Sequence, residues 1–499
     1  MGTPLRDPSL VDWSPPAGVA SGDDLVVVSN RQPYSHKYED GDIYVDRPVG
    51  GLSEALDEVL RRTGGAWVAW GDGDADRAAV DDRDRVAVPP DDPAYELRRV
   101  WLTDREVEGY YLGFSNQVLW PLCHDFVGQV YHDHDYWERY RSVNRKFAEA
   151  ATTVGGAGSL VWFQDYHLAL APRMLRSLVP NRRLVHFWHI PWPPAEVFEL
   201  SPHAPDLLDG LLGNDLLGFH HPSYREHFLE CADRLLEGAT VDWNASSIHY
   251  DGRTTRIESF PLGVPVERIH GHARSDGDAW EALPGGVDLS DRRVAIGVDR
   301  LDYTKGIVER LRGLERFWEQ HPEWRGRLSY VQIASESRSE IPAYREVQRE
   351  VIELVDHIDS RFGTDDWQPV VFTTKTLPKE TLCRQYRHSD LALVTPLRDG
   401  MNLVAQEFVA ANFDADAALV LGRGAGSHNL LGEGALTVTP LDPDEIAGAV
   451  HAALTMAPEE RRRRMQAMRQ RVVETDIGGW PQQVLGAAGV QAGRRRIPR

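Results

Sequence analysis

The chain has 499 residues, of which 76 are acidic and 55 are basic, and its formal net charge is −21. This charge argues against nucleic acid as a partner, because a surface that follows phosphates needs a basic stripe. No apolar run approaches the roughly 18 residues that cross a bilayer, and residues 1–22 lack the features of a secretory signal. We therefore expect a cytoplasmic protein of two or three domains with no membrane partner.

The counts of cysteine and lysine point to the setting of the protein. Its three cysteines, Cys123, Cys231 and Cys383, are far apart and odd in number, so neither a disulfide framework nor a cysteine-based metal site is indicated. Only five lysines accompany the many carboxylates. Such a composition suits concentrated salt, although a GC-rich genome would also replace Lys by Arg. An acidic chain that holds phosphates must concentrate positive charge locally.

Short apolar segments alternate with amphipathic segments in the first half of the chain. We predict a flexible extension over 1–22 and a first doubly wound α/β domain over 23–265. Its predicted strands are residues 25–29, 67–70, 160–163, 184–187 and 215–219, with helices over 136–150 and 168–178.

A second block repeats this alternation after a polar, Gly-rich and aperiodic stretch, 266–292, which we interpret as a linker. The second domain is predicted over 293–456, followed by a helical segment over 457–485 and a tail over 486–499. Its predicted strands are residues 294–298, 328–333, 370–372, 391–394 and 418–421. Two doubly wound domains place a cleft between the carboxyl ends of their sheets.

The segment Gly297–Gly306 has the form of an anion site. A buried strand ends in a polar loop, and the helix that begins near Ile307 directs its free N–H groups at that loop. Arg300 offers a planar fork and Lys305 a compact charge, both suited to phosphate. The alternative is a pair of solvated cations at a helix start.

A second strand, turn and helix follow in Thr395–Glu407. Asp399 and Gly400 lie in the turn, where backbone amides are exposed, and Glu407 lies on the helix, where a carboxylate can accept hydrogen bonds from a diol such as a ribose. An Asp in a turn is usually only a turn former. The interpretation of this segment as a binding site therefore depends on the predicted anion site Gly297–Gly306 in the same domain.

The first domain supplies other candidates after its strands. Arg31 closes the first strand, Gly51 opens a helix, and Tyr111 and Trp120 offer flat walls to a sugar. Core packing would explain the aromatic residues equally well. Gln164-Asp165-Tyr166-His167 and His189-Ile190-Pro191 follow two further strands, where a structural role for the His-x-Pro turn is the alternative.

These segments closely resemble the trehalose-6-phosphate synthase family, whose members have a two-domain GT-B architecture. The resemblance covers about Leu25 to Trp480, with blocks such as Val-Ser-Asn-Arg, Asp-Arg-Leu-Asp-Tyr-x-Lys-Gly and Arg-Asp-Gly-Met-Asn-Leu in the family's order. It implies a retaining glycosyltransferase that moves glucose from a nucleoside-diphosphate glucose to glucose 6-phosphate.

The resemblance also implies a role for each matching residue. The acceptor is expected to contact Arg31, Tyr111, Trp120, Asp165 and Arg338. The donor is expected to contact Gly51, Arg300, Lys305, Asp399, Gly400, Met401, Asn402, Leu403 and Glu407. The catalytic set is Asp165, His189, Arg300, Lys305 and Asp399. Neither a metal nor another cofactor is expected, because cations and amides stabilise the leaving diphosphate.

Some positions depart from the family pattern and leave alternatives open. The loop 32–49 is longer and is similar to that of glucosylglycerol-phosphate synthases, a sister group that uses glycerol 3-phosphate. The segment 372–377, expected beside the nucleobase, does not match, so UDP, GDP and ADP all remain candidates. The oligomeric state is open, a homo-oligomer included. A catalytically silent sensor is a third reading, opposed by the intact donor residues.

Overall fold

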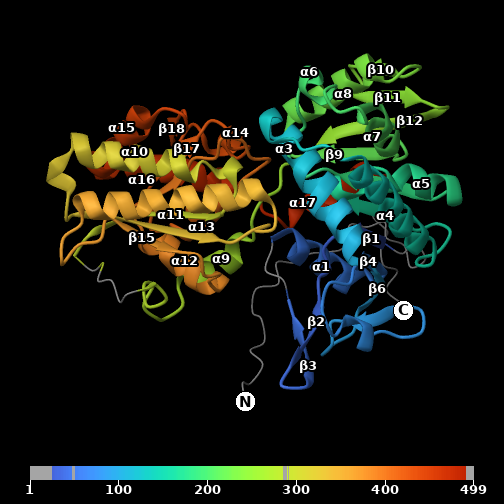
Figure 1. The fold of residues 1–499 in the computed structure, drawn as a ribbon, viewed down its shortest axis with the longest axis horizontal. Helices are drawn as coiled ribbons and strands as arrows, with labels where there is room; N and C mark the ends of the chain where they lie inside the picture. The colour runs from blue at the N-terminus through green and yellow to red at the C-terminus, as the bar shows by residue number, and fades with distance from the viewer. Residues whose placement is uncertain (1–24, 48–50, 285–288, 290, 490–499) are drawn as a thin grey trace, which may run out of the picture.

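The computed structural model describes residues 25–47, 51–284, 289 and 291–489, which form two α/β domains lying side by side (Figure 1). The predicted extension 1–22 and residues 490–499 of the predicted tail lie outside the described residues. Within the described part of the chain, no helix combines the length and apolar character needed to cross a membrane.

The first domain is built on one large, mainly parallel sheet. Its described strands are β1 (Leu25–Ser29), β4 (Ala66–Trp70), β5 (Arg85–Val88), β6 (Tyr95–Val100), β7 (Leu160–Gln164), β8 (Arg183–Phe187), β9 (Leu216–Phe219), β10 (Thr240–Asp242), β11 (Ser247–Tyr250) and β12 (Arg253–Ser259). They are arranged in the order β10-β11-β12-β9-β8-β7-β1-β4-β6-β5, and only β5, β10 and β11 at the two edges pair antiparallel. The five predicted strands are thus confirmed to within one residue at each end.

Helices cover both faces of this sheet, as expected for a doubly wound domain. They are α1 (Gly51–Thr63), α2 (Asp104–Glu106), α3 (Trp120–Cys123), α4 (His134–Thr152), α5 (Ala171–Leu178), α6 (Ala195–Phe198), α7 (Ala204–Leu211) and α8 (Pro222–Leu235), together with a π-helix, η2 (Val107–Leu119). A separate hairpin, β2 (Ser35–Glu39) and β3 (Asp42–Asp46), projects from the domain (Figure 1).

The second domain contains a smaller, fully parallel sheet. Its described strands are β13 (Arg293–Arg300), β14 (Leu328–Ser335), β15 (Val370–Thr373), β16 (Leu391–Val394), β17 (Ala418–Gly422) and β18 (Leu436–Val438), in the order β15-β14-β13-β16-β17-β18. Its helices are α9 (Val266–Ala273), α10 (Ile307–Gln320), α11 (Pro342–Phe362), α12 (Lys379–His388), α13 (Leu403–Ala411), α14 (His428–Leu431), α15 (Pro443–Thr455) and α16 (Pro458–Glu474).

The structure differs from the predicted linker at its start. Residues 266–273 form helix α9, which packs against α12 and α13. Its three buried residues, Val266, Ile269 and Ala273, belong to the core of the second domain. A helix with so few apolar positions gives only a weak periodic signal, which explains why the sequence did not predict it.

The end of the chain returns to the first domain. Helix α17 (Gly479–Ala487) lies against the first sheet, and Trp480 packs 5.0 Å from the ring of Trp162 and 4.8 Å from that of Phe187. The predicted C-terminal segment 457–485 therefore divides between domains, with α16 on the second and α17 on the first (Figure 1).

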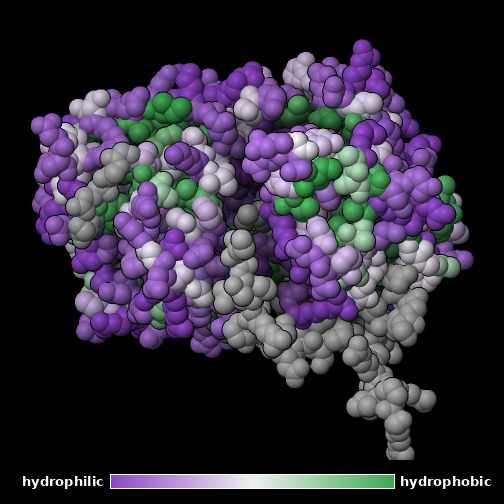
Figure 2. Space-filling view, turned by 90° about the horizontal axis from the view of Figure 1, so that it is seen from below, coloured by the Kyte–Doolittle hydropathy of each residue, from purple (hydrophilic) through white to green (hydrophobic). Residues whose placement is uncertain are grey.

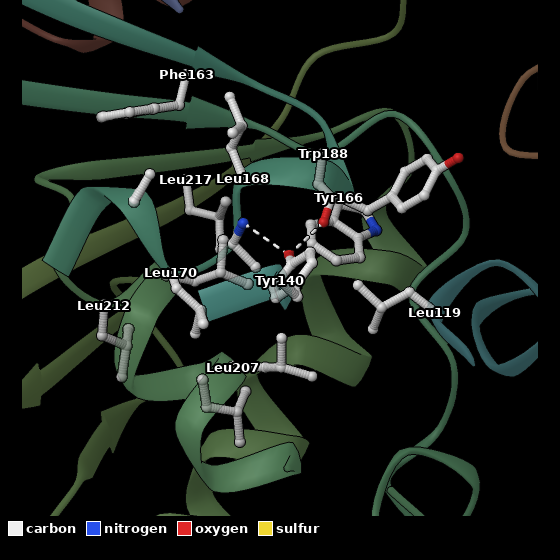
Figure 3. Packing of buried hydrophobic residues seen from close by; sticks show 14 of the residues in the cluster. Leu119, Tyr140, Phe163, Tyr166, Leu168, Leu170, Trp188, Leu207, Leu212 and Leu217 are labelled. Carbon is white, nitrogen blue, oxygen red and sulfur yellow. Dashed lines mark hydrogen bonds between the residues drawn. The ribbon is translucent and has the colours of Figure 1, made fainter. Parts of the chain in front are cut away.

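Buried packing fixes the loop that follows β7. The hydroxyl of Tyr140 on α4 donates to the carbonyl oxygen of Tyr166 at 2.6 Å and accepts from the amide of Ala169 at 3.1 Å (Figure 3). Both contacts lie in a core of leucines and aromatic residues, so the loop beginning at Asp165 is rigidly held. The outer surface differs in character, because the face in Figure 2 is mostly hydrophilic on both domains.

Candidate functional site

A cavity of about 290 Å³ lies between the domains, at the carboxyl ends of both sheets. The predicted site residues that line it are Arg31, Tyr111, Trp120, Asp165, His189, Arg300, Lys305, Arg338, Asp399 and Gly400. The structure therefore brings together residues that lie up to 369 positions apart, from Arg31 to Gly400 (400 − 31 = 369).

The loop after β13 carries the first cationic corner. Gly306 caps α10 with φ of 63°, and a Cβ there would lie 2.2 Å from the carbonyl oxygen of Thr395, so the position requires glycine. This tight contact joins the loops after β13 and β16. Lys305, immediately before it, donates from Nζ to Oδ2 of Asp399 at 2.5 Å.

Asp399 is held as a carboxylate. Burial alone would raise its pKa, but the charge of Lys305 and the hydrogen bond from it outweigh burial, so the pKa lies below its ordinary value. Nδ2 of Asn402 donates to the same oxygen at 3.1 Å. The Lys305–Asp399 pair is thus a preformed, polarised contact facing the cavity.

The loop after β16 is pressed against the first domain. A Cβ on Gly400 would lie 2.4 Å from the carbonyl oxygen of His189, which again requires glycine. The hydroxyl of Tyr224 on α8 lies 3.4 Å from the carbonyl oxygen of Asp399 and donates to it. The two domains therefore meet directly at this loop.

The remaining donor candidates are not among the residues that line the cavity. Asn402 caps α13 with φ of 63°, Met401 is buried, and Leu403 begins the helix. Glu407 is buried further along α13, where Nζ of Lys379 donates to Oε1 and the hydroxyl of Tyr386 lies 3.4 Å from Oε2. Gly51 begins α1, directly before two lining residues, Leu52 and Ser53.

Arg338 forms a second cationic corner, beside Trp120. Its Nη2 donates to the hydroxyl of Tyr166 at 3.1 Å, and its Cζ lies 4.3 Å from the Trp120 ring. Nη1 lies 3.8 Å from Oδ2 of Asp302, which is fully buried. The Cζ of Arg300 lies 5.5 Å from the same ring of Trp120, and its Nη2 lies 4.0 Å from the same Oδ2 of Asp302, so the two guanidinium groups share one indole and one buried carboxylate.

Tyr111 reaches the cavity from the π-helix η2, an element that is rare and often marks functional sites. Its ring stacks on His167 at 5.8 Å and 15°. Burial raises the pKa of its hydroxyl, but the charges of Arg338 and Arg31 outweigh burial and bring the pKa below its ordinary value. Tyr111, Arg31 and Arg338 thus form one cluster.

Asp165 and His189 meet at the back of the cavity. Asp165 adopts φ of 70°, and its Oδ1 accepts from the backbone amide of His189 at 3.1 Å. Burial raises the pKa of the Asp165 carboxyl to about 6. This carboxyl group is therefore poised to change its protonation near neutral pH.

His189 is fixed as a neutral imidazole. Its Nε2 donates to Oε1 of Gln164 at 2.9 Å, which leaves Nδ1 to accept from Nε2 of His220 at 3.2 Å. Burial, followed by the neighbouring His220, holds its pKa well below the ordinary value. The ring is therefore a positioned polar group, and it does not carry charge at neutral pH.

The lining also contains polar residues outside the predicted site set, among them His124, Gln164 and Tyr166. His124 lies four positions after Trp120, the spacing that places two side chains on one face of a helix, so a signal existed. Tyr166 and Gln164 flank Asp165, and the sequence alone does not show which of these side chains turns inward.

Among the described residues, one group of side chains could hold a metal ion: His321, Glu323 and His451. None of them lines the cavity. The two imidazole rings stack at 3.9 Å and 4°. A single ion cannot lie in both ring planes in this arrangement, so a ring would have to rotate before both could bind it.

Comparisons with known proteins cover almost the whole chain. The model of glycosyltransferase family 20 matches residues 23–488. A protein of Mycolicibacterium vanbaalenii named trehalose-6-phosphate synthase is 38% identical over 491 residues, which is 96% of this chain and 98% of the relative.

Two solved structures are similar in both domains. One is an α,α-trehalose-phosphate synthase (UDP-forming) from Burkholderia xenovorans in complex with glucose 6-phosphate, with 31% identity, a TM-score of 0.83, and coverage of 93% of this chain and 100% of the other. The second is from E. coli, bound with UDP-2-fluoro glucose, with 32% identity, a TM-score of 0.83, and coverage of 96% and 100%. The predicted architecture of two Rossmann-like domains across a cleft is confirmed.

Proposed function

We propose that this chain, which belongs to glycosyltransferase family 20, transfers glucose from a nucleoside-diphosphate glucose to glucose 6-phosphate, with retention, to form α,α-trehalose 6-phosphate. The predicted family, its GT-B fold and the prediction of an enzyme agree with the relatives, which are named trehalose-6-phosphate synthases. The nucleotide, the acceptor and the stereochemistry are the parts that we propose.

The observation that carries the proposal is the pairing of two cationic corners in one cavity. Arg300 and Lys305 form one corner, Arg31 and Arg338 form the other, and the guanidinium groups of Arg300 and Arg338 both lie near the Trp120 ring. A reaction between a sugar diphosphate and a sugar phosphate needs cations for two anionic groups in one cavity, together with room for sugar.

The donor corner fits a diphosphate. Lys305 and Arg300 offer charge-assisted hydrogen bonds, and the amide end of α10 adds its partial positive charge. Glu407 on α13 is the candidate for the ribose hydroxyls, once Lys379 shares or releases it. The E. coli relative bound with UDP-2-fluoro glucose favours UDP as the nucleotide.

The acceptor corner fits glucose 6-phosphate. Tyr111 and Arg338 can hold a phosphate, and the Trp120 ring offers a flat wall to the apolar face of a hexose. Glycerol 3-phosphate would leave that wall without a partner. The Burkholderia xenovorans relative was solved with glucose 6-phosphate, which favours the same acceptor.

Retention requires the acceptor oxygen to arrive on the face that the diphosphate leaves. The bond from the glucose anomeric carbon to the diphosphate oxygen breaks, the bond to the acceptor oxygen forms, and the acceptor proton passes to the leaving diphosphate. Arg300 and Lys305 stabilise the charge that builds on the diphosphate. Gly400 and His189, in contact across the domains, hold the reacting sugars in place and exclude water.

A product assay tests the proposal. The purified protein is incubated with UDP-, GDP- or ADP-glucose and with either glucose 6-phosphate or glycerol 3-phosphate. The phosphorylated product is then identified by mass and by the proton NMR couplings of its anomeric centres. We expect α,α-trehalose 6-phosphate from UDP-glucose and glucose 6-phosphate. A glucosylglycerol phosphate, or an inverted linkage, would contradict the proposal.

A further inference from the structure

His124 lines the cavity, and one of its two ring nitrogens is hydrogen-bonded within the protein. The residue follows α3, is only 2% exposed, and packs its ring 4.2 Å from that of Trp120. Its Nδ1 lies 2.7 Å from the carbonyl oxygen of Trp120. Because a carbonyl oxygen can only accept, Nδ1 must carry the proton, and the neutral ring presents its lone pair at Nε2.

Nε2 is left open to the cavity. Within the described part of the chain it makes no hydrogen bond, and it is not among the polar atoms that are sealed from solvent without a partner. Burial lowers the pKa of His124 to about 4, so the ring stays neutral at physiological pH and the lone pair remains available.

The neighbours of His124 indicate what this lone pair accepts. Asp302, Lys305 and Asp399 are the charged groups that act most on the ring, and Lys305 and Asp399 form the donor corner. Phosphate oxygens have no proton to give a neutral imidazole acceptor, whereas sugar hydroxyls do. Lys305 and Asn402 both donate to Oδ2 of Asp399, so the side-chain acceptors left for glucose hydroxyls at this corner are Oδ1 of Asp399 and Nε2 of His124.

We propose that Nε2 of His124 accepts a hydrogen bond from a hydroxyl of the donor glucose and so contributes to donor specificity. This inference rests on the proposed function, since it requires a nucleotide sugar at the donor corner. The inference assigns His124 to the sugar and not to the nucleotide. A substitution of His124 should therefore weaken the binding of the nucleotide sugar without weakening that of the nucleotide alone.

Two substitutions distinguish this role from a structural one. His124→Asn can keep the hydrogen bond to the Trp120 carbonyl, because its amide nitrogen replaces Nδ1, but it removes the acceptor at Nε2. His124→Gln can place its amide oxygen near the position of Nε2 and so retain an acceptor. Calorimetry measures the affinities of both variants and of the wild-type protein for UDP and for UDP-glucose. If the product assay selects GDP-glucose, GDP and GDP-glucose are used instead.

We expect His124→Asn to bind UDP as the wild-type protein does and to bind UDP-glucose roughly 5- to 20-fold more weakly, with His124→Gln recovering most of the loss. Equal weakening of UDP and UDP-glucose in the Asn variant would overturn the inference, as would unchanged affinity for UDP-glucose. The proposed function fails separately, if the wild-type protein forms no trehalose 6-phosphate.

Discussion

Nε of Arg398 lies 3.2 Å from Oδ2 of Asp125, and the two residues belong to different domains. Arg398 directly precedes Asp399 and Gly400, which also contact the first domain through Tyr224 and His189. Three consecutive residues therefore tie the donor loop to the opposite domain. The Arg398–Asp125 pair is the charged member of this contact.

Removing the domain-crossing pair should cost more activity than stability. Both side chains are partly exposed, so the pair contributes about 0–1 kcal/mol to stability. Because the neighbouring Asp399 must be placed against the first domain, we expect Arg398→Ala to lower kcat about tenfold with little change in Tm. Steady-state kinetics and a thermal melt measure the two effects.

A matched control for Arg398 lies within the second domain. Arg387 pairs with Asp414 at 2.9 Å with a similarly exposed guanidinium, and it does not line the cavity. Arg387→Ala should leave kcat unchanged. Arg398→Lys, which keeps the charge, should recover part of the activity. If Arg398→Ala and Arg387→Ala lose activity equally, the contact between the two domains has no special role in activity.

The donor corner should be needed for the chemical step. Removing a charge-assisted contact to a buried diphosphate costs roughly 2 to 4 kcal/mol of transition-state stabilisation, or about 30- to 1000-fold in rate. We expect Arg300→Ala and Lys305→Ala each to lose activity on this scale while remaining folded by circular dichroism. Near-normal turnover in either variant would remove that residue from the mechanism.

Substitutions in the acceptor corner should weaken the binding of only one substrate, glucose 6-phosphate. Tyr111→Phe removes a hydroxyl between Arg31 and Arg338, and we expect it to raise the KM for glucose 6-phosphate about 5- to 20-fold, because a charge-assisted hydrogen bond is lost. The KM for the donor should change less than twofold. Equal effects on the two substrates would mean that the two corners are assigned wrongly.

Arg338 is also expected to contribute to stability. A conservative variant is therefore needed to separate this contribution from substrate binding. The guanidinium of Arg338 lies 3.8 Å from the fully buried Asp302, whose Oδ2 has no hydrogen-bond partner among the residues that the structure describes. We expect Arg338→Ala to lower Tm as well as activity, since it removes a compensating charge from a buried carboxylate. Arg338→Lys should restore Tm more than the KM for glucose 6-phosphate. Restoration of both alike would argue against a bidentate phosphate contact.

Asp165 should make stability depend on pH. Its pKa is raised from 3.8 in the unfolded chain to about 6 in the fold. The fold then binds the proton more tightly, so its contribution is fully present below pH 3.8 and is lost as pH rises through 6. The loss amounts to at most about 3 kcal/mol. The substrate-free wild type should therefore lose stability between pH 4 and 7 relative to Asp165→Asn, which keeps the oxygen facing the His189 amide. If the Tm values of the wild type and of Asp165→Asn change with pH in parallel, this prediction is contradicted.

The acidic composition predicts a response to salt. Seventy-six acidic residues against 55 basic ones repel each other in dilute buffer, and the Debye length shortens from about 30 Å at 0.01 M to about 3 Å at 1 M. We expect Tm and turnover to rise toward molar potassium chloride, while the KM of both anionic substrates rises modestly. Full stability and the best turnover in dilute buffer would leave the low lysine count to genome composition.

The strands and the two main loops were predictable, because runs such as Leu25–Ser29 and Leu391–Val394 are apolar and bounded by polar turns. The hairpin β2–β3 was missed, although Asp40-Gly41 between the strands is a two-residue turn signal with positive φ at both residues and Asp42–Asp46 contains Ile, Tyr and Val. The π-helix η2 lacks the 3.6-residue period on which helix prediction rests.

Part of the site could not be read from local patterns. The Lys379–Glu407 pair joins two helices and depends on their packing alone. His124 is near Trp120 in the sequence, but its tautomer follows from a single carbonyl contact that only the fold reveals. Sequence reasoning found the residues that carry charge, and it missed those whose role depends on orientation.

The return of α17 to the first domain has a consequence for synthesis of the chain. Trp480 completes the packing around Trp162 and Phe187, so the first domain's core is unfinished until residue 480 has been added. A nascent first domain therefore still lacks part of its core when Val472, the last core residue of the second domain, has been added. Truncation just before Ile477 should leave the second domain folded and the first prone to aggregate.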